Sequence, residues 1–225
     1  MSNDFQYIDR GATKVCYRVL GPISNNVYCI DDGAGGVIIV DPEKSAELIL
    51  EMAGEAKVSA IFITHRHHDH IGALRALHDA TGAPVYASEI DSPDVEDPRT
   101  PPFGVRPEGC PVDVKLHDGD SFEVGACKWV FLHTPGHTEG SGCYYLAAGE
   151  GPNAEGLPLL FSGDTLFHAA TGRTDFEGGN MDDMRASMRK LGKLPDDVLV
   201  CPGHGELTTI KAERERVIEY IGGTE

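Results

Sequence analysis

The sequence predicts an α/β fold in which potential metal ligands gather at the end of a buried strand. Residues 58–64 form a short, largely apolar run that is typical of a buried β-strand, and an amphipathic helix pattern precedes it. Strand, helix and strand in this order predict a parallel crossover connection. Directly after the strand, residues 65–70 contain four histidines and an aspartate, which indicates a catalytic rather than a purely structural metal site; a solvated loop rich in histidine is the alternative.

The length and charge of the chain limit its possible partners. The 225 residues are enough for one sizeable core, and no low-complexity linker divides them, so we expect a single domain over residues 1–225. The formal net charge of -17 repels phosphate backbones and anionic membrane surfaces. A small molecule is therefore the expected partner, and neither nucleic acid nor a membrane is.

The N-terminal residues and the cysteines predict a cytoplasmic location. Residues 1–11 have neither the basic start nor the apolar core of a signal peptide, and no apolar run approaches the roughly 18 residues that span a bilayer. The six cysteines are scattered without a C-x-x-C pair, mostly in apolar or strand-like segments. This pattern fits reduced, buried thiols better than a disulfide framework.

The first third of the chain predicts hairpins followed by a crossover. Three strands are expected at residues 14–19, 26–31 and 36–40, and the spacing of apolar residues predicts a helix over residues 45–56. Asp41 ends the third strand. It either accepts a hydrogen bond from a metal-binding imidazole or only begins the turn before a proline.

The middle of the chain combines a helix with a long irregular excursion. The apolar spacing predicts a helix from residue 71 to residue 82, on which His78 is a surface residue, and a strand over residues 85–87. Residues 88–111 contain six prolines and no periodic apolar pattern. They form either a lid or pocket wall or a solvated loop without a role.

Three strand ends in the second half carry further potential ligands. Strands are expected at residues 128–133, 158–161 and 197–201, and each runs into a short polar motif. Two of these motifs are Pro-Gly-His, ending at His137 and His204, and the third is Ser-Gly-Asp, ending at Asp164. In the two Pro-Gly-His motifs, proline stops the strand and glycine allows a sharp turn. The ligands at all three strand ends are expected to converge on one rim of the sheet. The final helix is expected over residues 209–220.

Seven side chains are therefore candidate metal ligands, and all stand at strand ends: His65, His67, Asp69, His70, His137, Asp164 and His204. Seven ligands are too many for one tetrahedral zinc ion. They divide into two sets of three protein ligands, one set for each of two ions, and one carboxylate that bridges the ions. The remaining histidines near these motifs are not expected to be ligands: His68, His117, His133 and His168.

The ordered motifs His65-x-His67-x-Asp69-His70, Pro-Gly-His137, Ser-Gly-Asp164 and Pro-Gly-His204 resemble the metallo-β-lactamase superfamily over nearly the whole chain. Residues 172–176 resemble the short glyoxalase II-like hydrolases, the hydroxyacylglutathione hydrolase type. The resemblance implies an αββα four-layer sandwich with metals between loops at one sheet edge. It also implies that His65, His67 and His137 hold one ion, that Asp69, His70 and His204 hold the other, and that Asp164 bridges them.

The resemblance further implies a hydrolase with two divalent metal ions, zinc being preferred over iron or manganese. Two ions lower the pKa of a shared water, so a bridging hydroxide exists near neutral pH, and Asp69 is the catalytic residue that orients it. A small-molecule thioester suits this chemistry, because its thiolate leaving group needs no proton donor.

The sequence departs from the glyoxalase II-like pattern at several positions, and these differences leave the identity of the substrate open. Arg173 stands where the family has a basic glutathione contact, yet Asp175 replaces an expected aromatic residue, and an Arg173–Asp175 ion pair is the alternative. Only about 20 residues follow His204, where full-length glyoxalase II carries a helical extension. The rival readings are a persulfide dioxygenase with a single iron, a lactonase and a non-catalytic metal-binding protein. The acyl group, the thiol, the native metal and the oligomeric state stay open.

Overall fold

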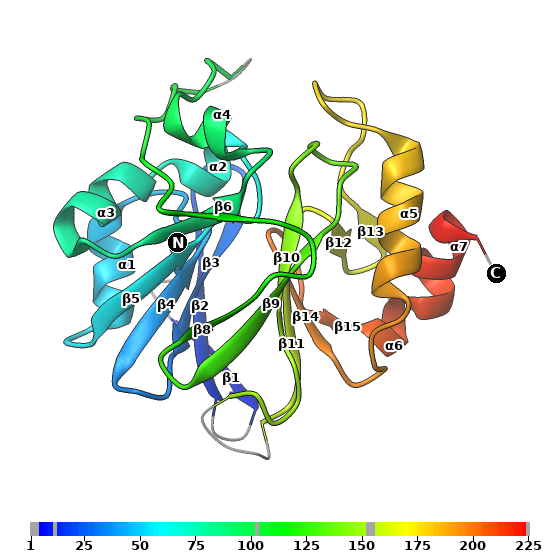
Figure 1. Ribbon diagram of the computed structural model, residues 1–225, viewed down its shortest axis with the longest axis horizontal. Coiled ribbons are helices and arrows are strands. Elements are labelled where there is room, and N and C mark those ends of the chain that lie inside the picture. Colours follow the sequence, from blue (N-terminus) through cyan, green and yellow to red (C-terminus); the bar gives the residue numbers. More distant parts are fainter. Residues whose placement is uncertain (1–4, 11–12, 102–103, 152–155, 224–225) are drawn as a thin grey trace.

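Two β-sheets packed face to face form the centre of the protein (Figure 1). The computed structural model describes residues 5–10, 13–101, 104–151 and 156–223. Within them, the first sheet contains seven strands in sequence order, namely β1 (Gln6–Arg10), β2 (Thr13–Leu20), β3 (Asn25–Asp31), β4 (Gly36–Val40), β5 (Lys57–Phe62), β6 (Val85–Ser88) and β7 (Val114–Leu116).

The first sheet confirms the predicted hairpins and the parallel crossover. Strands β1 to β4 pair antiparallel, whereas β4 to β7 pair parallel. Helix α1 (Ala46–Ala53) connects β4 to β5 and is shorter at both ends than the expected residues 45–56. The crossover brings the end of β5, and the histidine cluster after it, next to the end of β4.

The second sheet has the strand order β15-β14-β11-β10-β9-β8. Strands β11 and β14 are parallel, and the other neighbours are antiparallel. The bounds are β8 (Ser121–Val124), β9 (Cys127–His133), β10 (Gly142–Leu146), β11 (Leu159–Gly163), β14 (Leu199–Pro202) and β15 (Thr208–Thr209), and a separate small hairpin pairs β12 (Leu166–Phe167) with β13 (Ala170–Thr171).

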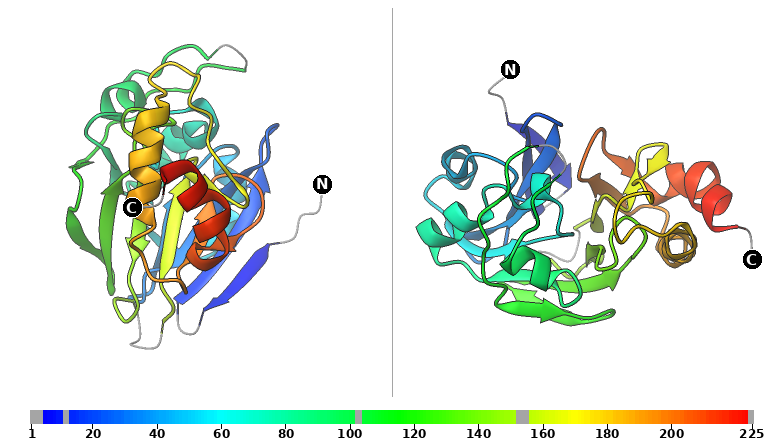
Figure 2. Two further views of the ribbon diagram at one scale, coloured as in Figure 1. Left: turned by 90° about the vertical axis from the view of Figure 1, so that its right-hand side faces the viewer. Right: turned by 90° about the horizontal axis from the view of Figure 1, so that it is seen from above.

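Three apolar cores define four layers, which confirms the αββα sandwich. One core lies between the first sheet and its helices, one lies between the sheets, and one lies between the second sheet and the C-terminal helices. Figure 2 shows the helices on the two outer faces. None of the six cysteines forms a disulfide, and five of them are buried, as expected from their apolar surroundings.

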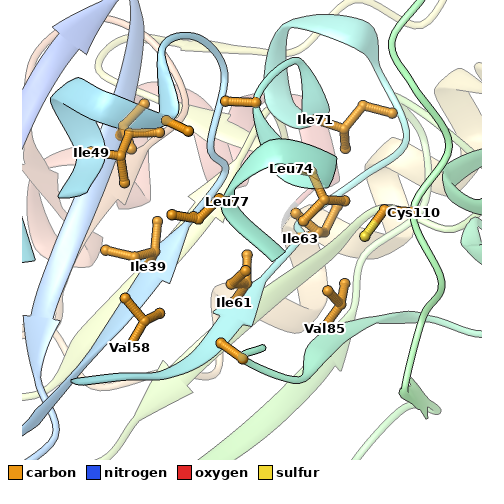
Figure 3. Packing of buried hydrophobic residues seen from close by; sticks show 14 of the residues in the cluster. Ile39, Ile49, Val58, Ile61, Ile63, Ile71, Leu74, Leu77, Val85 and Cys110 are labelled. Carbon is orange, nitrogen blue, oxygen red and sulfur yellow. The ribbon is translucent and has the colours of Figure 1, made fainter. Parts of the chain in front are cut away.

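The outer core of the first sheet shows how helix periodicity becomes packing (Figure 3). Ile49 of α1 and Leu77 of α3 (Leu74–Thr81) are fully buried against Ile39 and Ile61 of the strands. Burying a side chain of this size contributes roughly 1.5–3 kcal/mol. Replacing one by alanine would cost more, because the rigid sheet beneath cannot fill the cavity.

Aromatic side chains fill the space between the sheets. The Phe62 ring of β5 stacks on Tyr144 of β10 with centroids 4.4 Å apart, and it meets Trp129 edge-on at 5.3 Å. On the other side, Tyr28 meets Phe161 edge-on at 5.1 Å. These contacts fix the two sheets relative to each other, and therefore the loops at their ends.

The helix expected over residues 71–82 is confirmed at its C-terminal end but wrong at its start, because α3 begins only at Leu74 and a separate short helix lies before it. Helix α2 (His68–Ile71) precedes α3, and Gly72 separates them. A Cβ at Gly72 would lie 2.0 Å from the Glu43 carbonyl oxygen, and the amide of Ala73 donates to the carbonyl of Pro42 at 2.8 Å. This close contact draws the backbone out of the helical path.

Further elements differ from the expectations. The excursion at residues 88–111 contains a short helix, α4 (Ser92–Glu96), where we expected irregular chain; its residues 102–103 lie outside the described part. Helix α5 (Met181–Leu191) was not predicted, although Asn180 caps it. The last helix is continuous but divided into α6 (Ile210–Glu213), a π-helical turn η1 (Arg214–Ile218) and α7 (Glu219–Gly222). Among the described residues, no helix has the length and apolar character to span a membrane.

Candidate metal centre

The seven expected ligands lie at the ends of strands from both sheets. His65 and His67 follow β5 of the first sheet, and Asp69 and His70 lie in α2 at the upper end of the sandwich in Figure 1. The other three follow strands of the second sheet, namely His137 after β9, Asp164 after β11 and His204 after β14. The rim predicted from a single sheet is therefore a rim between two sheets.

The ligand atoms form compact groups. Within each group they lie no more than 4.8 Å apart, and the groups are His65, His67 and His137; Asp69, His70 and His204; and His65, His70 and Asp164. The first two groups match the division that the resemblance implied. The third joins them through Asp164.

Asp164 contacts both sets of histidines through different oxygens. Its Oδ2 lies 3.4 Å from Nε2 of His137, whereas its Oδ1 lies 3.4 Å from Nε2 of His70 and 3.7 Å from Nε2 of His204. A carboxylate divided in this way can bind two cations at once.

The unsatisfied polar atoms of the site fit metal ions. Nε2 of His65, Nε2 of His70 and Oδ1 of Asp164 are buried and make no hydrogen bond within the described protein. Buried polar atoms normally have partners, and these three are directed toward one another from different elements. Five imidazoles and two carboxylates suit zinc, iron or manganese.

The other ring nitrogen of most of these histidines is held in place. Nδ1 of His137 donates to the carbonyl of Arg173 at 2.7 Å, and Nδ1 of His204 lies 3.2 Å from the carbonyl of Ser24. Nδ1 of His65 lies 3.1 Å from the Thr64 hydroxyl. Such contacts direct Nε2 into the site and fix the tautomer.

Asp41 has the role that the sequence left undecided. Its carboxylate accepts from Nδ1 of His70 at 2.8 Å and from the amide and hydroxyl of Thr64 at 2.8 and 2.7 Å. Asp41 has φ 51°, a left-handed conformation that aspartate tolerates better than most residues. It therefore orients a candidate ligand as well as forming the turn.

The electrostatics of the two groups differ. Burial, with the neighbouring imidazoles, lowers the pKa of His65 and lowers the pKa of His67 to about 3. Burial also opposes protonation of His70, but the carboxylates of Asp69, Asp164 and Asp41 outweigh it and raise its pKa well above the usual range. His65 and His67 are thus kept neutral, the form that binds metal, whereas the second group gathers negative charge that attracts a cation.

Arg173 contributes to the site through its backbone. Its side chain pairs with Asp175 at 2.7 Å and lies over the Phe176 ring at 4.1 Å, so the alternative ion pair is formed. Its carbonyl, in contrast, holds His137. The sequence suggested a role only for the guanidinium.

Two residues that sequence reasoning missed support the segments that carry Asp69 and His204. Asn25 donates to the carbonyl of Asp69 at 2.6 Å, and Asn26 donates to the carbonyls of Pro202 and Gly205 at 3.0 and 2.9 Å. The only signal was two adjacent asparagines at the start of an apolar strand, both of which are buried.

The glycines of the two Pro-Gly-His motifs serve different purposes. Gly136 has φ 136°, which supports the expected sharp turn. Gly203 has no positive φ, so that explanation is wrong for it. A Cβ at Gly203 would lie 2.5 Å from Oδ1 of Asp164 and 2.7 Å from Cε1 of His70, so glycine is needed for space.

The five histidines not expected as ligands, which are His68, His78, His117, His133 and His168, lie outside these groups in the described chain. They have other contacts; for example, His117 lies against Glu89, and Nε2 of His133 contacts the carbonyl of Glu139 at 2.8 Å.

Several known proteins are similar to this chain in sequence and fold. The model of the family described as "Metallo-beta-lactamase superfamily" matches residues 20–204. A hydroxyacylglutathione hydrolase of Fuscovulum blasticum is 34% identical over 185 residues, which cover 81% of this chain and 63% of that enzyme. Among solved structures, the BLEG-1 B3 metallo-beta-lactamase is 33% identical with a TM-score of 0.81, covering 93% of this chain and 100% of that one.

A second solved structure bears on the metal. TTHA1623 in a di-iron-bound form is 30% identical with a TM-score of 0.70, covering 89% of this chain and 97% of that one. The similar proteins share the fold but carry names that imply different reactions and metals.

Proposed function

This chain belongs to the metallo-β-lactamase superfamily, and on that premise we propose that it is a hydrolase that uses two divalent metal ions to cleave small-molecule thioesters. The observation that carries the proposal is the position of Asp164, whose two oxygens approach different histidine groups. Two ions bound by the seven ligands would lower the pKa of a shared water and polarise the acyl carbonyl.

The side chains divide the remaining work. Oδ2 of Asp69 faces His204 at 3.1 Å and His70 at 3.3 Å, whereas Oδ1 has only the longer contact of 3.7 Å to Nδ1 of His68 and is the oxygen assigned to orient the attacking water and accept its proton. The carboxylates of Asp69, Asp164 and Asp41 surround the His70 ring and keep it directed at the site. A thioester fits because its thiolate leaves without a proton donor.

Aromatic rings flank the site and support a small organic substrate. The half-exposed Phe176 ring lies 5.9 Å from the His67 ring, and the Phe167 ring lies 6.2 Å from the His204 ring. They offer apolar surface on both sides for the acyl group and the thiol. Because the Arg173 side chain is paired with Asp175, a thiol other than glutathione is included in the proposal.

A single-iron dioxygenase is the rival reading, and the second ligand group argues against it. One ion would leave Asp69, His70 and His204 without a function, although their ligand atoms also lie within 4.8 Å of one another. We therefore favour hydrolysis by two ions.

The test combines metal analysis with a substrate panel. The purified protein is expected to bind two equivalents of zinc and to hydrolyse an S-acyl thioester faster than the matching oxygen ester. Asp164→Ala should remain folded, bind less metal and lose thioesterase activity. One equivalent of iron with oxygen uptake on a persulfide, or unchanged turnover in Asp164→Ala, would contradict the proposal.

A further inference from the structure

Asp91 is a buried carboxylate outside the proposed ligand set. It precedes α4 in the excursion at residues 88–111, and its relative exposure is 1%. A buried carboxylate is costly unless several donors satisfy it. Its donors therefore indicate why it is there.

Four hydrogen bonds reach Asp91, two on each oxygen. Oδ1 accepts from Nη1 of Arg66 at 2.8 Å and from the amide of Gly140 at 3.0 Å. Oδ2 accepts from the amide of Arg66 at 3.0 Å and from the hydroxyl of Thr138 at 2.8 Å. All four donors come from the two loops that carry the first histidine group.

The donors to Asp91 are neighbours in sequence of the first histidine group, which is His65, His67 and His137. Arg66 stands between His65 and His67, and Thr138 directly follows His137. The Arg66 side chain is held further by Asp94 at 3.2 Å. One carboxylate thus joins a loop from the first sheet to a loop from the second.

We propose that Asp91 is a positioning residue that holds His65, His67 and His137 in place and so sets the metal affinity of this group alone. The inference rests on the proposed two-metal site but not on the identity of the substrate. It also gives the excursion a role: the segment supplies the carboxylate that joins the two loops.

The second group has its own support, which makes the proposed effect selective. Asp41 contacts His70 directly, and Asn25 holds the backbone of Asp69. Among the described residues, no hydrogen bond joins Asp91 to Asp69, His70 or His204. Loss of Asp91 should therefore leave the second group intact.

The first experiment measures zinc affinity by competition with a chromophoric chelator. In Asp91→Asn, an NH₂ group replaces one oxygen and faces two donors, one from each loop, so each loop keeps only one of its two hydrogen bonds to this side chain. We expect one zinc equivalent to bind about 10–100-fold more weakly and the other to bind as in the unmodified protein. Asp97→Asn is the matched control, because this carboxylate lies on the same segment but its side chain is 87% exposed.

A double-mutant comparison assigns the weakened equivalent to a group. In a His204→Ala background, Asp91→Asn should weaken the remaining zinc by the same factor. In a His137→Ala background, it should have no further effect on the remaining zinc. Equal weakening in both backgrounds would overturn the proposal.

A milder variant guards against misfolding. Thr138→Val removes one of the four donors with little change of shape, and it should weaken the same zinc equivalent by a smaller factor. Circular dichroism of the metal-free variants checks the fold. Unchanged zinc affinity in both Asp91→Asn and Thr138→Val would overturn the proposal, whereas absent thioesterase activity with selective zinc loss would count only against the proposed substrate.

Discussion

The Asp41 carboxylate accepts a hydrogen bond from Nδ1 of His70 at 2.8 Å, and both side chains are almost completely buried. This contact lies directly behind a proposed ligand, so it controls both the direction and the basicity of the ring.

Asp41→Asn is therefore expected to lower zinc affinity and kcat by about 10–100-fold while the fold is kept. Asparagine tolerates the left-handed backbone at this position, and Asp41→Ala should be less stable because alanine does not. Chelator competition and urea unfolding separate the two effects. Equal zinc affinity in Asp41→Asn and the unmodified protein would show that the contact is only structural.

Gly203→Ala should disrupt the metal site through space alone. The added methyl group would lie 2.5 Å from Oδ1 of Asp164, so the bridging carboxylate or the His70 ring must move. We expect loss of at least one zinc equivalent by elemental analysis, with a far-ultraviolet circular dichroism spectrum like that of the unmodified protein.

Gly54→Ala provides the contrast for this prediction. Gly54 has φ 61°, but a Cβ there would meet nothing within 4 Å. The Gly54→Ala substitution should lower the free energy of unfolding by about 1–2 kcal/mol through backbone strain and leave zinc binding unchanged. Zinc loss in Gly54→Ala, or none in Gly203→Ala, would argue against a steric effect at the site.

Glu43 should make the stability of the metal-free protein depend on pH. Burial, and next the negative charge of Asp69, raise the pKa of Glu43 to about 7, and its Oε2 has no hydrogen-bond partner in the described structure. Between pH 4.5 and about 7 the unfolded chain loses this proton while the folded protein keeps it. The Glu43 contribution to the free energy of unfolding therefore falls as the pH rises.

Glu43→Gln removes this titration. The variant should match the unmodified protein near pH 4 and exceed it by up to about 3 kcal/mol at pH 8. Urea unfolding of both metal-free proteins at several pH values measures the difference. A constant difference across this range would show that Glu43 does not titrate as expected.

Arg173→Ala tests whether the guanidinium contacts the substrate. The side chain is 62% exposed and occupied by Asp175 and Phe176, while the carbonyl that holds His137 is unaffected by the substitution. We expect zinc content to be unchanged and KM for a glutathione thioester to change by less than about threefold. A tenfold rise in KM for that substrate, with no change for a neutral thioester, would assign Arg173 to binding.

The sequence predicted the parts of the site that depend on local patterns. Apolar runs that end in Thr64-His65, Pro135-Gly136 or Ser162-Gly163 identify strand ends, and strand ends place side chains in loops. The contacts between segments distant in sequence could not be predicted in this way. Asp91 lies in a proline-rich stretch without periodicity, and its four donors are recognisable only after both loops have folded around it.

Two local predictions failed for the same reason. The helix expected through Gly72 is interrupted because the chain there contacts the backbone of Glu43, and the glycine of the last motif is needed for a neighbouring carboxylate rather than for its own turn. In both cases a residue distant in sequence decides the conformation, which a propensity or a motif does not contain.

The origin of the seven residues in two sheets has a consequence for dissecting the protein. The first half of the chain supplies His65, His67, Asp69 and His70, whereas the second half supplies His137, Asp164 and His204. Cut at the exposed turn around Asp118, the chain would yield two fragments, neither of which carries a complete centre. Zinc would then favour their reassembly. The two zinc ions would act as a cross-link between two fragments that the polypeptide no longer joins.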